Sequence, residues 1–447
     1  MMPFPIRADS PVTHAAPLPA ACDVAVIGGG VIGVMTALFL ARAGRRVVLL
    51  DKGRIAGEQS SRNWGWIRQQ GRDPAELPMM IEARRIWQDL ASEVGPGLGY
   101  RQAGVMYLAG SEAQAAKYEG WLPHAAAHGI DTRMLSRAEM QAMVPNSAGW
   151  TSALWTASDG QAEPWAAVPL LARLAADAGV AIREGCAVRA LDIAAGRVAG
   201  VVTEAGRIAC ERVVLAGGAW SGLFARAHGV HLPQLSVRST VAATQVLPEV
   251  FAGAASDKSF AFRRRADGRY TLAPGSFHEF FIGPDAFRHL RPFIPQIRAD
   301  ISGTRFLPMA PKGYPDAWTT PRKWDAAKPG PFEALRVLDP APNARMVEQI
   351  RAKFAAAFPS LGAVRIDCAW AGMIDTMPDV VPVIDHAAAV PGLTIATGMS
   401  GHGFGIGPGV GRVVADLVQG RAPGHDLTRF RLTRFADGSP IVIGPSL

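Results

Sequence analysis

CDVAVIGGGVIGVMTALFLARAGRRVVLLD, residues 22–51, is the stretch that decides the fold class. Its apolar run over 22–29 predicts a buried strand, and the glycine turn that follows leads into a helix that ends at Gly44. RRVVLLD, residues 45–51, predicts a second buried strand. Strand, crossover helix and strand in this order make a βαβ unit, which indicates a parallel sheet of the α/β class.

The glycines of this turn have the spacing of a dinucleotide-binding site. Gly28, Gly30 and Gly33 occupy the GxGxxG positions, and Asp51 ends the second strand. In this pattern the glycines let a pyrophosphate approach the helix N-terminus, and the acid accepts from a ribose hydroxyl. We therefore predict dinucleotide binding rather than a purely structural turn. The predicted contacts in this segment are Gly28, Gly30, Val31, Ile32, Gly33, Asp51 and Lys52.

The composition is that of a large folded chain. With 447 residues, 49% of them apolar and 19% charged, two or three domains are expected and extensive disorder is not. The net charge is +8, but the basic residues are scattered singly and in pairs, which favours anionic substrates over nucleic acid. We expect a cytoplasmic protein without a metal site, since the four cysteines are far apart and no signal peptide or long apolar run is seen.

Two further glycine-rich junctions lie far along the chain. VVLAGGAW, 213–220, predicts a buried strand that ends in a glycine pair, and 392–420 predicts a strand, a loop with seven glycines between Gly398 and Gly411, and a helix. Such loops turn backbone N–H groups towards a flat or anionic ligand. We expect both junctions to contact the nucleotide, through Gly217, Gly218, Trp220, Gly401, His402, Gly403, Phe404 and Gly405, and we expect Val188 and Gly372 to contact it from outside the two junctions.

EQSSRNWGWIRQQG, residues 58–71, has neither helical nor strand periodicity. Its tryptophans, arginines and amides make it either a polar surface loop or a loop folded around a ligand. Together with GGGVIG, VVLAGGAWS, WAGMIDTMPDVVPVID (370–385) and GMSGHGFG (398–405), it resembles the D-amino-acid oxidase superfamily of FAD oxidoreductases. GEQSSR, FRRRADGRY and PFEALRV are similar to bacterial L-amino-acid deaminases, and SGHGF and GWIR to monomeric sarcosine oxidase.

This resemblance implies an α/β, two-domain fold with a split Rossmann-like FAD domain and a mixed-sheet α+β substrate domain. The implied segments are an N-terminal arm at 1–20, an FAD-binding domain at 21–97, 158–232 and 366–425, a substrate domain at 98–157 and 233–365, and a tail at 426–447. Residues 301–331 form a Pro/Trp-rich insertion that cannot be regular for long. It is either a lid, a membrane or partner contact, or an inert excursion.

The resemblance also implies the chemistry. Both branches oxidise a carbon that bears nitrogen, by hydride transfer to flavin N5, and water hydrolyses the imine to an oxo acid and an amine or ammonia. Within the loop, Ser60, Ser61, Arg62, Trp64, Gly65 and Trp66 are implied FAD contacts, and Arg68 is implied to hold the substrate carboxylate. His402 either moves a proton or simply turns its loop. The other expected pocket walls are Gln69, Arg263, Phe277 and Trp370.

Three departures from the relatives sharpen these expectations. Gly405 and Gly275 stand where the two branches have a second cation for the carboxylate, so Arg68 becomes the main anion contact. Phe281 stands where sarcosine oxidase has the lysine that promotes reaction with dioxygen, so we expect a dehydrogenase with a quinone or another respiratory carrier as acceptor. The cysteine that links flavin in sarcosine oxidase has no counterpart near Met373, and Cys368 lies too early on its strand, so FAD should be noncovalent. The alternative is a redox subunit of a larger assembly that uses 301–331 as its partner or membrane interface.

Overall fold

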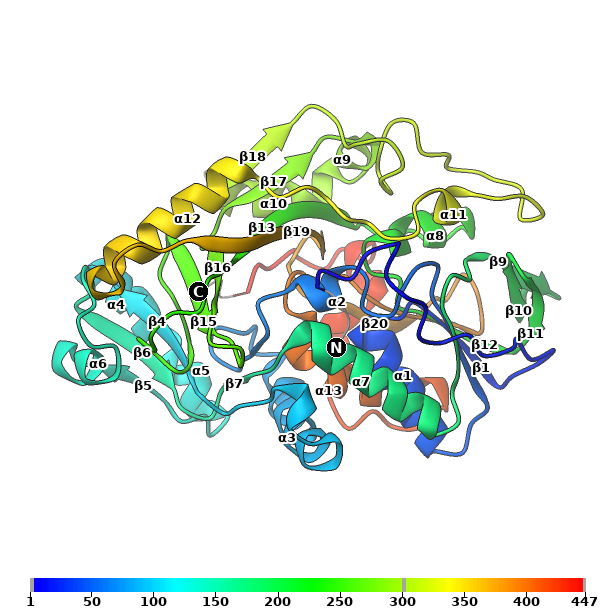
Figure 1. Cartoon of the computed structure of the whole chain (residues 1–447). Coiled ribbons are helices and arrows are strands. Elements are labelled where there is room, and N and C mark those ends of the chain that lie inside the picture. Colours follow the sequence, from blue (N-terminus) through cyan, green and yellow to red (C-terminus); the bar gives the residue numbers. More distant parts are fainter. Residues whose placement is uncertain (1–3, 300–302, 445–447) are drawn as a thin grey trace.

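The structure is a computed structural model that describes residues 4–299 and 303–444 (Figure 1). The first residues of the predicted arm and insertion, 1–3 and 301–302, and the last of the tail, 445–447, lie outside this description. It has the predicted α/β class, with two main sheets that meet along the middle of the molecule. Among the described residues, no helix is both long and apolar enough to cross a lipid bilayer.

The first main sheet has six strands and is built around the predicted βαβ unit. Five apolar strands pair in parallel, and one antiparallel strand closes the edge. The order is β20 (Val383–His386), β21 (Leu393–Thr397), β12 (Arg212–Leu215), β1 (Val24–Ile27), β2 (Val47–Leu50) and β8 (Ala181–Arg183). Its strands come from three separate parts of the chain, as expected for a split nucleotide-binding sheet.

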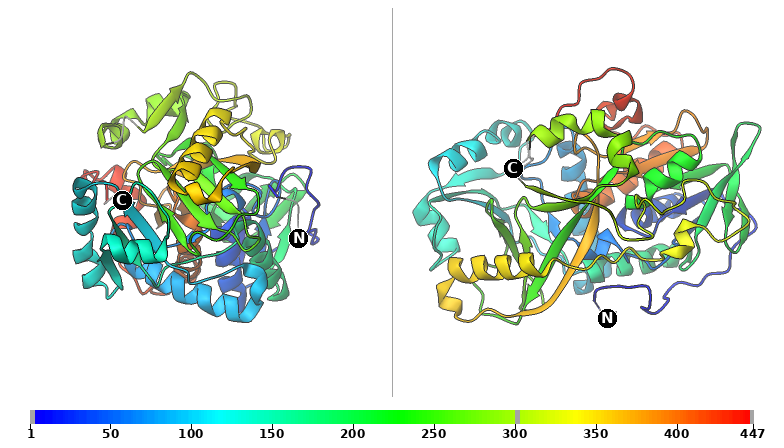
Figure 2. Two further views of the ribbon diagram at one scale, coloured as in Figure 1. Left: turned by 60° about the vertical axis from the view of Figure 1, so that its left-hand side comes forward. Right: turned by 90° about the horizontal axis from the view of Figure 1, so that it is seen from above.

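Layers of different kinds cover the two faces of this sheet. One face packs against α1 (Val31–Arg42), α3 (Leu77–Val94), α7 (Pro164–Asp177) and α13 (Gly403–Val418), which share one apolar core with the sheet. The other face packs against a three-stranded sheet of β9 (Val188–Ala194), β10 (Arg197–Thr203) and β11 (Gly206–Ala209), followed by α8 (Ser221–Ala227). Figure 2 shows these three layers from two further sides.

The second main sheet has ten strands and carries the other half of the molecule. Nine follow in the order β18 (Thr304–Leu307), β17 (His278–Phe281), β13 (Leu235–Thr244), β16 (Tyr270–Pro274), β15 (Phe260–Arg264), β14 (Ala254–Ser256), β4 (Val105–Ala109), β6 (Ser152–Thr156) and β5 (Thr132–Leu135). The tenth, β19 (Ile366–Thr376), pairs with β13 along nearly its whole length. α12 (Ala344–Ala357) packs on one face (Figure 1), and α4 (Glu112–Glu119), α5 (Leu122–Ala127) and α6 (Arg137–Met143) lie near β5 and β6.

Short elements join the two halves. β3 (Trp66–Ile67) pairs with β7 (Gly160–Gln161), and α2 (Gln59–Arg62) packs against α7 and β19. The loop at 58–71 is therefore largely buried between the halves, and the surface-loop interpretation is wrong.

The glycine loop predicted at 398–411 is shorter than expected, because α13 already begins at Gly403. Its glycines permit close helix packing instead of opening a loop. A Cβ on Gly411 would lie 2.5 Å from Met35 Cβ of α1, and one on Gly409 would lie 2.6 Å from Met79 O of α3. Tertiary packing thus overrides the poor helix propensity of glycine here.

Two other regions are well defined. Residues 284–299, between β17 and β18, form α9 (Pro284–Arg288) and α10 (Leu290–Ala299); Pro284 fits the first turn of α9, where its missing N–H costs nothing. The N-terminal arm is held against the rest of the fold over its described residues. The ring of Phe4 packs on Trp165 and Trp370 at 4.9 and 4.6 Å, and Ala16 N donates to Ile182 O.

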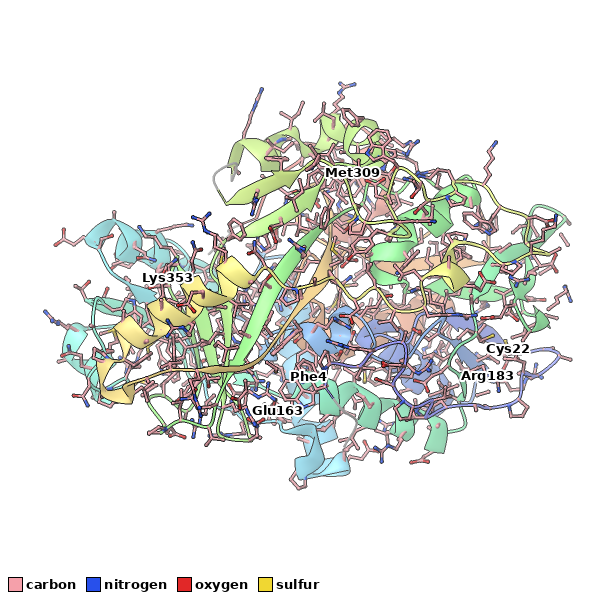
Figure 3. All side chains as sticks on the ribbon, turned by 45° about the horizontal axis from the view of Figure 1, so that its top comes forward. Phe4, Cys22, Glu163, Arg183, Met309 and Lys353 are labelled. Carbon is pink, nitrogen blue, oxygen red and sulfur yellow. The ribbon has the colours of Figure 1, made fainter. Side chains whose placement is uncertain are left out.

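The insertion at 301–331 contains one regular element, β18, within its described residues before α11 (Pro331–Ala334). Its remaining chain is irregular, as its prolines predict, but it is anchored: Trp324 Nε1 donates to Arg189 O at 2.9 Å. Figure 3 marks Met309 in this segment, on the side of the molecule occupied by β18. Met309 and Trp318 are 63% and 55% exposed, so this anchored segment also presents apolar side chains to solvent.

Candidate active site

A large cavity of about 1030 Å³ lies where the two main sheets meet. Strands β1, β2 and β12 of the first sheet and β13, β17 and β19 of the second line it, together with the loop after β2 and the turn before α13. Ligand pockets commonly have volumes of about 300–1,000 Å³, so this one can hold a dinucleotide together with a small substrate.

The βαβ unit forms one end of the cavity. Asp51, directly after β2, accepts hydrogen bonds from Gly29 N and Gly53 N, both at 2.7 Å. Val31 N, at the start of α1, donates to Ser60 Oγ at 2.9 Å. Burial raises the pKa of Asp51 to about 6. A carboxylate and a helix N-terminus are thus fixed side by side, the arrangement that suits a ribose next to a pyrophosphate.

Most of the predicted cofactor residues line this cavity. They are Gly28, Gly30, Val31, Ile32, Asp51, Lys52, Ser60, Arg62, Trp64, Trp66, Val188, Gly217, Gly218, Trp220, Gly372, Gly401, His402, Gly403 and Phe404. Gly33, Ser61, Gly65 and Gly405 lie behind its walls instead. A Cβ on Gly33 would lie 1.9 Å from Gly28 O, and one on Gly405 would lie 3.0 Å from Trp66 O, so these two positions set how closely the walls pack.

Two predicted cofactor cations already have protein partners. The buried guanidinium of Arg62 donates to Asp339 Oδ1 at 2.5 Å, to Ala371 O at 3.0 Å and to Ile6 O at 2.9 Å. Lys52 Nζ donates to Glu58 Oε1 at 2.8 Å and lies 4.1 Å from the centre of the Trp220 ring. Arg62 therefore joins the arm and β19 to α2, and with Nε bound to Gly57 O at 3.1 Å four of its five N–H donors are taken by protein acceptors.

Arg68 lines the other end of the cavity. Its Nη1 donates to Gln70 O, and its guanidinium lies 5.7 Å from the centre of the Tyr107 ring. A guanidinium has five N–H donors, so most of the fork stays available to a carboxylate. Trp66 lies beside it, with its indole N–H buried and without a hydrogen-bond acceptor in the described part of the chain.

A second arginine, Arg72, lines the same end, and the sequence analysis did not single it out. Its Nε donates to Arg68 O at 3.2 Å and its Nη2 donates to His402 O at 3.0 Å. The side chain is 2% exposed, and burial lowers its pKa to about 10. Arg72 therefore ties the loop at 58–71 to the turn before α13 and adds a buried positive charge to this end.

Glu76 and His402 complete a polar cluster around Arg72. Glu76 Oε2 lies 3.6 Å from Arg72 Nη1 and 4.0 Å from His402 Nδ1. The Glu76 side chain is 1% exposed, and burial raises its pKa to about 7. Burial and the charges of Arg72 and Arg68 hold the pKa of His402 well below its usual value, so the imidazole is neutral at pH 7.

Four predicted pocket residues are not part of the cavity lining. Gln69 Nε2 donates to Asp159 Oδ1 at 3.1 Å, and Arg263 forms a two-fold ion pair with Glu163 at 3.0 and 2.9 Å. Phe277 packs against the core under α12, while its neighbours Ser276 and His278 line the cavity. Trp370 is covered by Phe4 and donates to Arg62 O at 2.9 Å.

Sequence reasoning also missed Asp375 on β19. Its carboxylate lines the cavity and accepts from Gly398 N at 2.7 Å and from Gln234 Nε2 at 3.1 Å. Burial raises its pKa. The only signal was its place in the segment 370–385. Arg72 and Glu76 gave none, because residues 68–76 are not helical and their spacing of four therefore places no side chains on a common face.

The residues present fit FAD. A Cβ on Gly30 would lie 3.0 Å from Ser60 Oγ, so this glycine keeps the helix N-terminus open to the cavity. The buried Asp51 suits the ribose, the glycines at 217–218 and 401–403 open two more edges, and Trp66 offers a buried N–H. These groups lie along one continuous cavity, as an extended dinucleotide requires.

Comparison with known proteins agrees with this fit. The family model described as DAO, FAD dependent oxidoreductase, matches residues 23–417. The structure is similar to that of L-amino acid deaminase from Proteus myxofaciens in complex with anthranilate, with a TM-score of 0.91 and 30% identity, over 96% of this chain and 97% of that one.

Two curated relatives are similar in sequence. Sarcosine oxidase subunit beta of Rhizobium meliloti is 26% identical over 93% of this chain and 89% of its own. Human mitochondrial sarcosine dehydrogenase is 29% identical over 51% of this chain, and the match covers about a quarter (26%) of that longer protein. The cofactor is FAD, and the chain belongs to the DAO family of FAD-dependent oxidoreductases.

Proposed function

We propose that this protein oxidises an amino acid or an N-substituted amino acid at the C–H next to nitrogen. The product imine is hydrolysed by water to an oxo acid and an amine or ammonia. The observation that carries the proposal is the end of the cavity where Arg68, Arg72, Trp66 and His402 meet. Bound FAD supplies the hydride acceptor for this chemistry.

The chain's own residues account for recognition of an amino acid. Arg68 presents a planar fork that suits a carboxylate, and Arg72 adds positive charge behind it. Trp66 and Tyr107, with ring centres 6.5 Å apart, form an apolar wall that excludes water from the reacting carbon. Neutral His402 can accept a proton on the way to product.

The name of the similar deaminase and those of the sarcosine enzymes support this substrate class. They do not favour the alternative, a redox subunit of a larger assembly.

We also propose that FAD is bound noncovalently. All four cysteines lie among the described residues as free thiols, and none lines the cavity. Acid precipitation of the purified protein should therefore release FAD into the supernatant, and a flavin that stays with the pellet would contradict this.

For the electron acceptor we propose a quinone or another respiratory carrier in preference to dioxygen. The resemblance aligns Phe281 with the oxygen-activating lysine of sarcosine oxidase, and this alignment alone supports the choice, since Phe281 packs on Tyr314 with a ring-centre distance of 5.9 Å outside the cavity lining. After anaerobic reduction, a quinone analogue should reoxidise the flavin faster than air does. Reoxidation by air as fast as turnover would refute the choice.

We also propose a cytoplasmic protein that binds peripherally to the inner membrane through the insertion and the preceding helices α9 and α10. Five exposed apolar side chains belong to this part of the chain: Phe287, Leu290, Phe306, Met309 and Trp318. Basic residues lie among them in the sequence, and the side chain of Arg305 is 57% exposed. Apolar groups among cations suit an anionic lipid surface. The wild-type protein should co-sediment with anionic vesicles, and the double variant Met309→Ser/Trp318→Ser should not. If the wild-type protein does not bind the vesicles, the membrane site is refuted and contact with a protein partner remains as the alternative.

The substrate assignment is tested by anaerobic bleaching of the flavin. The panel comprises L- and D-amino acids, N-methyl amino acids and cyclic imino acids, each with the matching amine that lacks the carboxylate as control. At least one acid should bleach the flavin while its control does not. If dithionite reduces the flavin and no panel member does, the assignment is wrong.

A further inference from the structure

The buried cluster beside the cavity holds more polar groups than recognition of a carboxylate needs. Arg72 Nη1, both carboxylate oxygens of Glu76 and Nδ1 of His402 are buried, and none of them makes a hydrogen bond within the described part of the chain. Buried polar atoms of this kind are rare because each costs about 1–3 kcal/mol. Four of them in one place indicate a function.

Their geometry is that of a path leading away from the cavity. The His402 side chain is 25% exposed and lines the cavity, while its Nδ1 is buried and faces Glu76 Oε2 at 4.0 Å. Glu76 lies behind His402, outside the lining, and the same oxygen, Oε2, lies 3.6 Å from Arg72 Nη1. Closing the gap of 4.0 Å to a hydrogen bond takes a shift of about 1 Å, within reach of a small side-chain rotation.

An amino acid in this cavity must lose a proton before it is oxidised, since an ammonium nitrogen has no lone pair with which to form an imine. This requirement rests on the proposed function. We propose that Glu76 receives this proton through the ring of His402. An N–H bond of the ammonium breaks and leaves its electron pair on nitrogen, the proton bonds to His402 Nε2, and the proton on Nδ1 moves to Glu76 Oε2.

His402 is neutral before and after this transfer and only changes tautomer. Glu76 is a positioning residue, because it acts on the substrate through His402.

The charges around the cluster support the direction of transfer. Arg68 and Arg72 lower the pKa of His402, so a proton does not remain on the ring. Burial and the nearby Asp73 raise the pKa of Glu76, while Arg72 and Arg68 act against this rise. Tyr107 of β4 and Asp159 act on Arg72 as well, and both raise its pKa against the effect of burial. The cluster therefore places a better proton acceptor behind a poorer one.

The first test uses the ligand-free holoenzyme and needs no substrate. The protein is labelled with ¹⁵N-histidine, and His402→Gln assigns the signal. The ¹⁵N chemical shifts of the His402 ring should change over the pH range in which Glu76 is deprotonated. Glu76→Gln should abolish this titration and change the tautomer. Ring nitrogens that do not respond to Glu76→Gln overturn the relay.

The second test is the pH profile of kcat/KM with the best substrate of the bleaching panel. Glu76→Gln should lower kcat/KM at pH 7 about a hundredfold, and the loss should shrink as the pH rises and the free amine forms. Glu76→Asp should restore part of the activity at pH 7. Glu82→Gln is the matched control on α3, since Glu82 pairs with Arg412 outside the cavity and its loss should leave the profile unchanged.

The outcomes separate the two proposals. A wild-type profile in Glu76→Gln, or an equal loss at every pH with FAD still bound, overturns the relay and leaves the proposed function standing. Failure of every amino acid to bleach the wild-type flavin overturns the proposed function, and the relay with it.

Discussion

Replacing Arg68 by Ala removes the cation on which substrate recognition rests. The guanidinium gives one donor to Gln70 O and keeps the others for the cavity. Two charge-assisted hydrogen bonds to a carboxylate contribute about 1.5–3 kcal/mol each, and the charge of Arg72 remains close by and offsets part of their loss. We therefore expect a loss of about 3 kcal/mol, which lowers kcat/KM roughly a hundredfold.

The assay is the anaerobic rate of flavin reduction as a function of substrate concentration. Arg68→Ala should raise the substrate requirement while FAD content and the flavin spectrum stay at wild-type values. Arg68→Lys should recover only part of the loss, because an ammonium lacks the bidentate fork. Arg173→Ala, an exposed position on α7, is the control. Unchanged kinetics in Arg68→Ala, or an equal loss for an amine without a carboxylate, would refute the reasoning.

Three further predictions concern the cofactor, the packing and the pH dependence. Asp51→Ala should lower FAD affinity at least tenfold in a flavin-release titration, because the ribose loses its acceptor; retention of FAD at wild-type affinity would place the ribose elsewhere. Gly411→Ala should lower the free energy of unfolding by about 2 kcal/mol, since overpacking against Met35 outweighs the gain of about 1 kcal/mol in helix propensity; a thermal shift upwards would contradict this. Glu76 has its pKa raised to about 7 in the folded protein, so its contribution to stability is complete below its unfolded value of 4.5 and is lost as the pH rises through 7. The loss is about 3 kcal/mol, and Glu76→Gln should remove it from unfolding curves recorded between pH 5 and 8. If the free energies of unfolding of the wild type and Glu76→Gln differ by the same amount at every pH, the loss does not come from Glu76.

The fold was predictable where local pattern and tertiary packing agree. Residues 22–51 contain a complete βαβ unit whose glycines and apolar runs act over short distances, and the apolar face of 77–94 gives α3 directly. The start of α13 was not predictable in this way. Its glycines favour a loop locally, and only the close approach of α1 and α3 makes a helix of them.

The site was predictable as a set of loops but not as a set of side chains. Trp370 is on the same strand as Gly372, which lines the cavity, yet the arm brings Phe4 over it from the other end of the chain. Arg263 forms an ion pair with Glu163, which lies a hundred residues away in the sequence, and no local sequence pattern predicts such a pair. Arg72 and Glu76 gain their role from a turn that lies more than three hundred residues later.

The most direct measurement of the central claim is the anaerobic rate of flavin reduction by one amino acid in its protiated form and in the form deuterated at the carbon next to nitrogen. If that C–H bond is broken in the cavity between Arg68 and His402, reduction is slower with the deuterated substrate, and Arg68→Ala weakens binding of both forms alike. Equal rates with a substrate whose chemical step limits reduction, or reduction that ignores the substrate's carboxylate, would contradict the account.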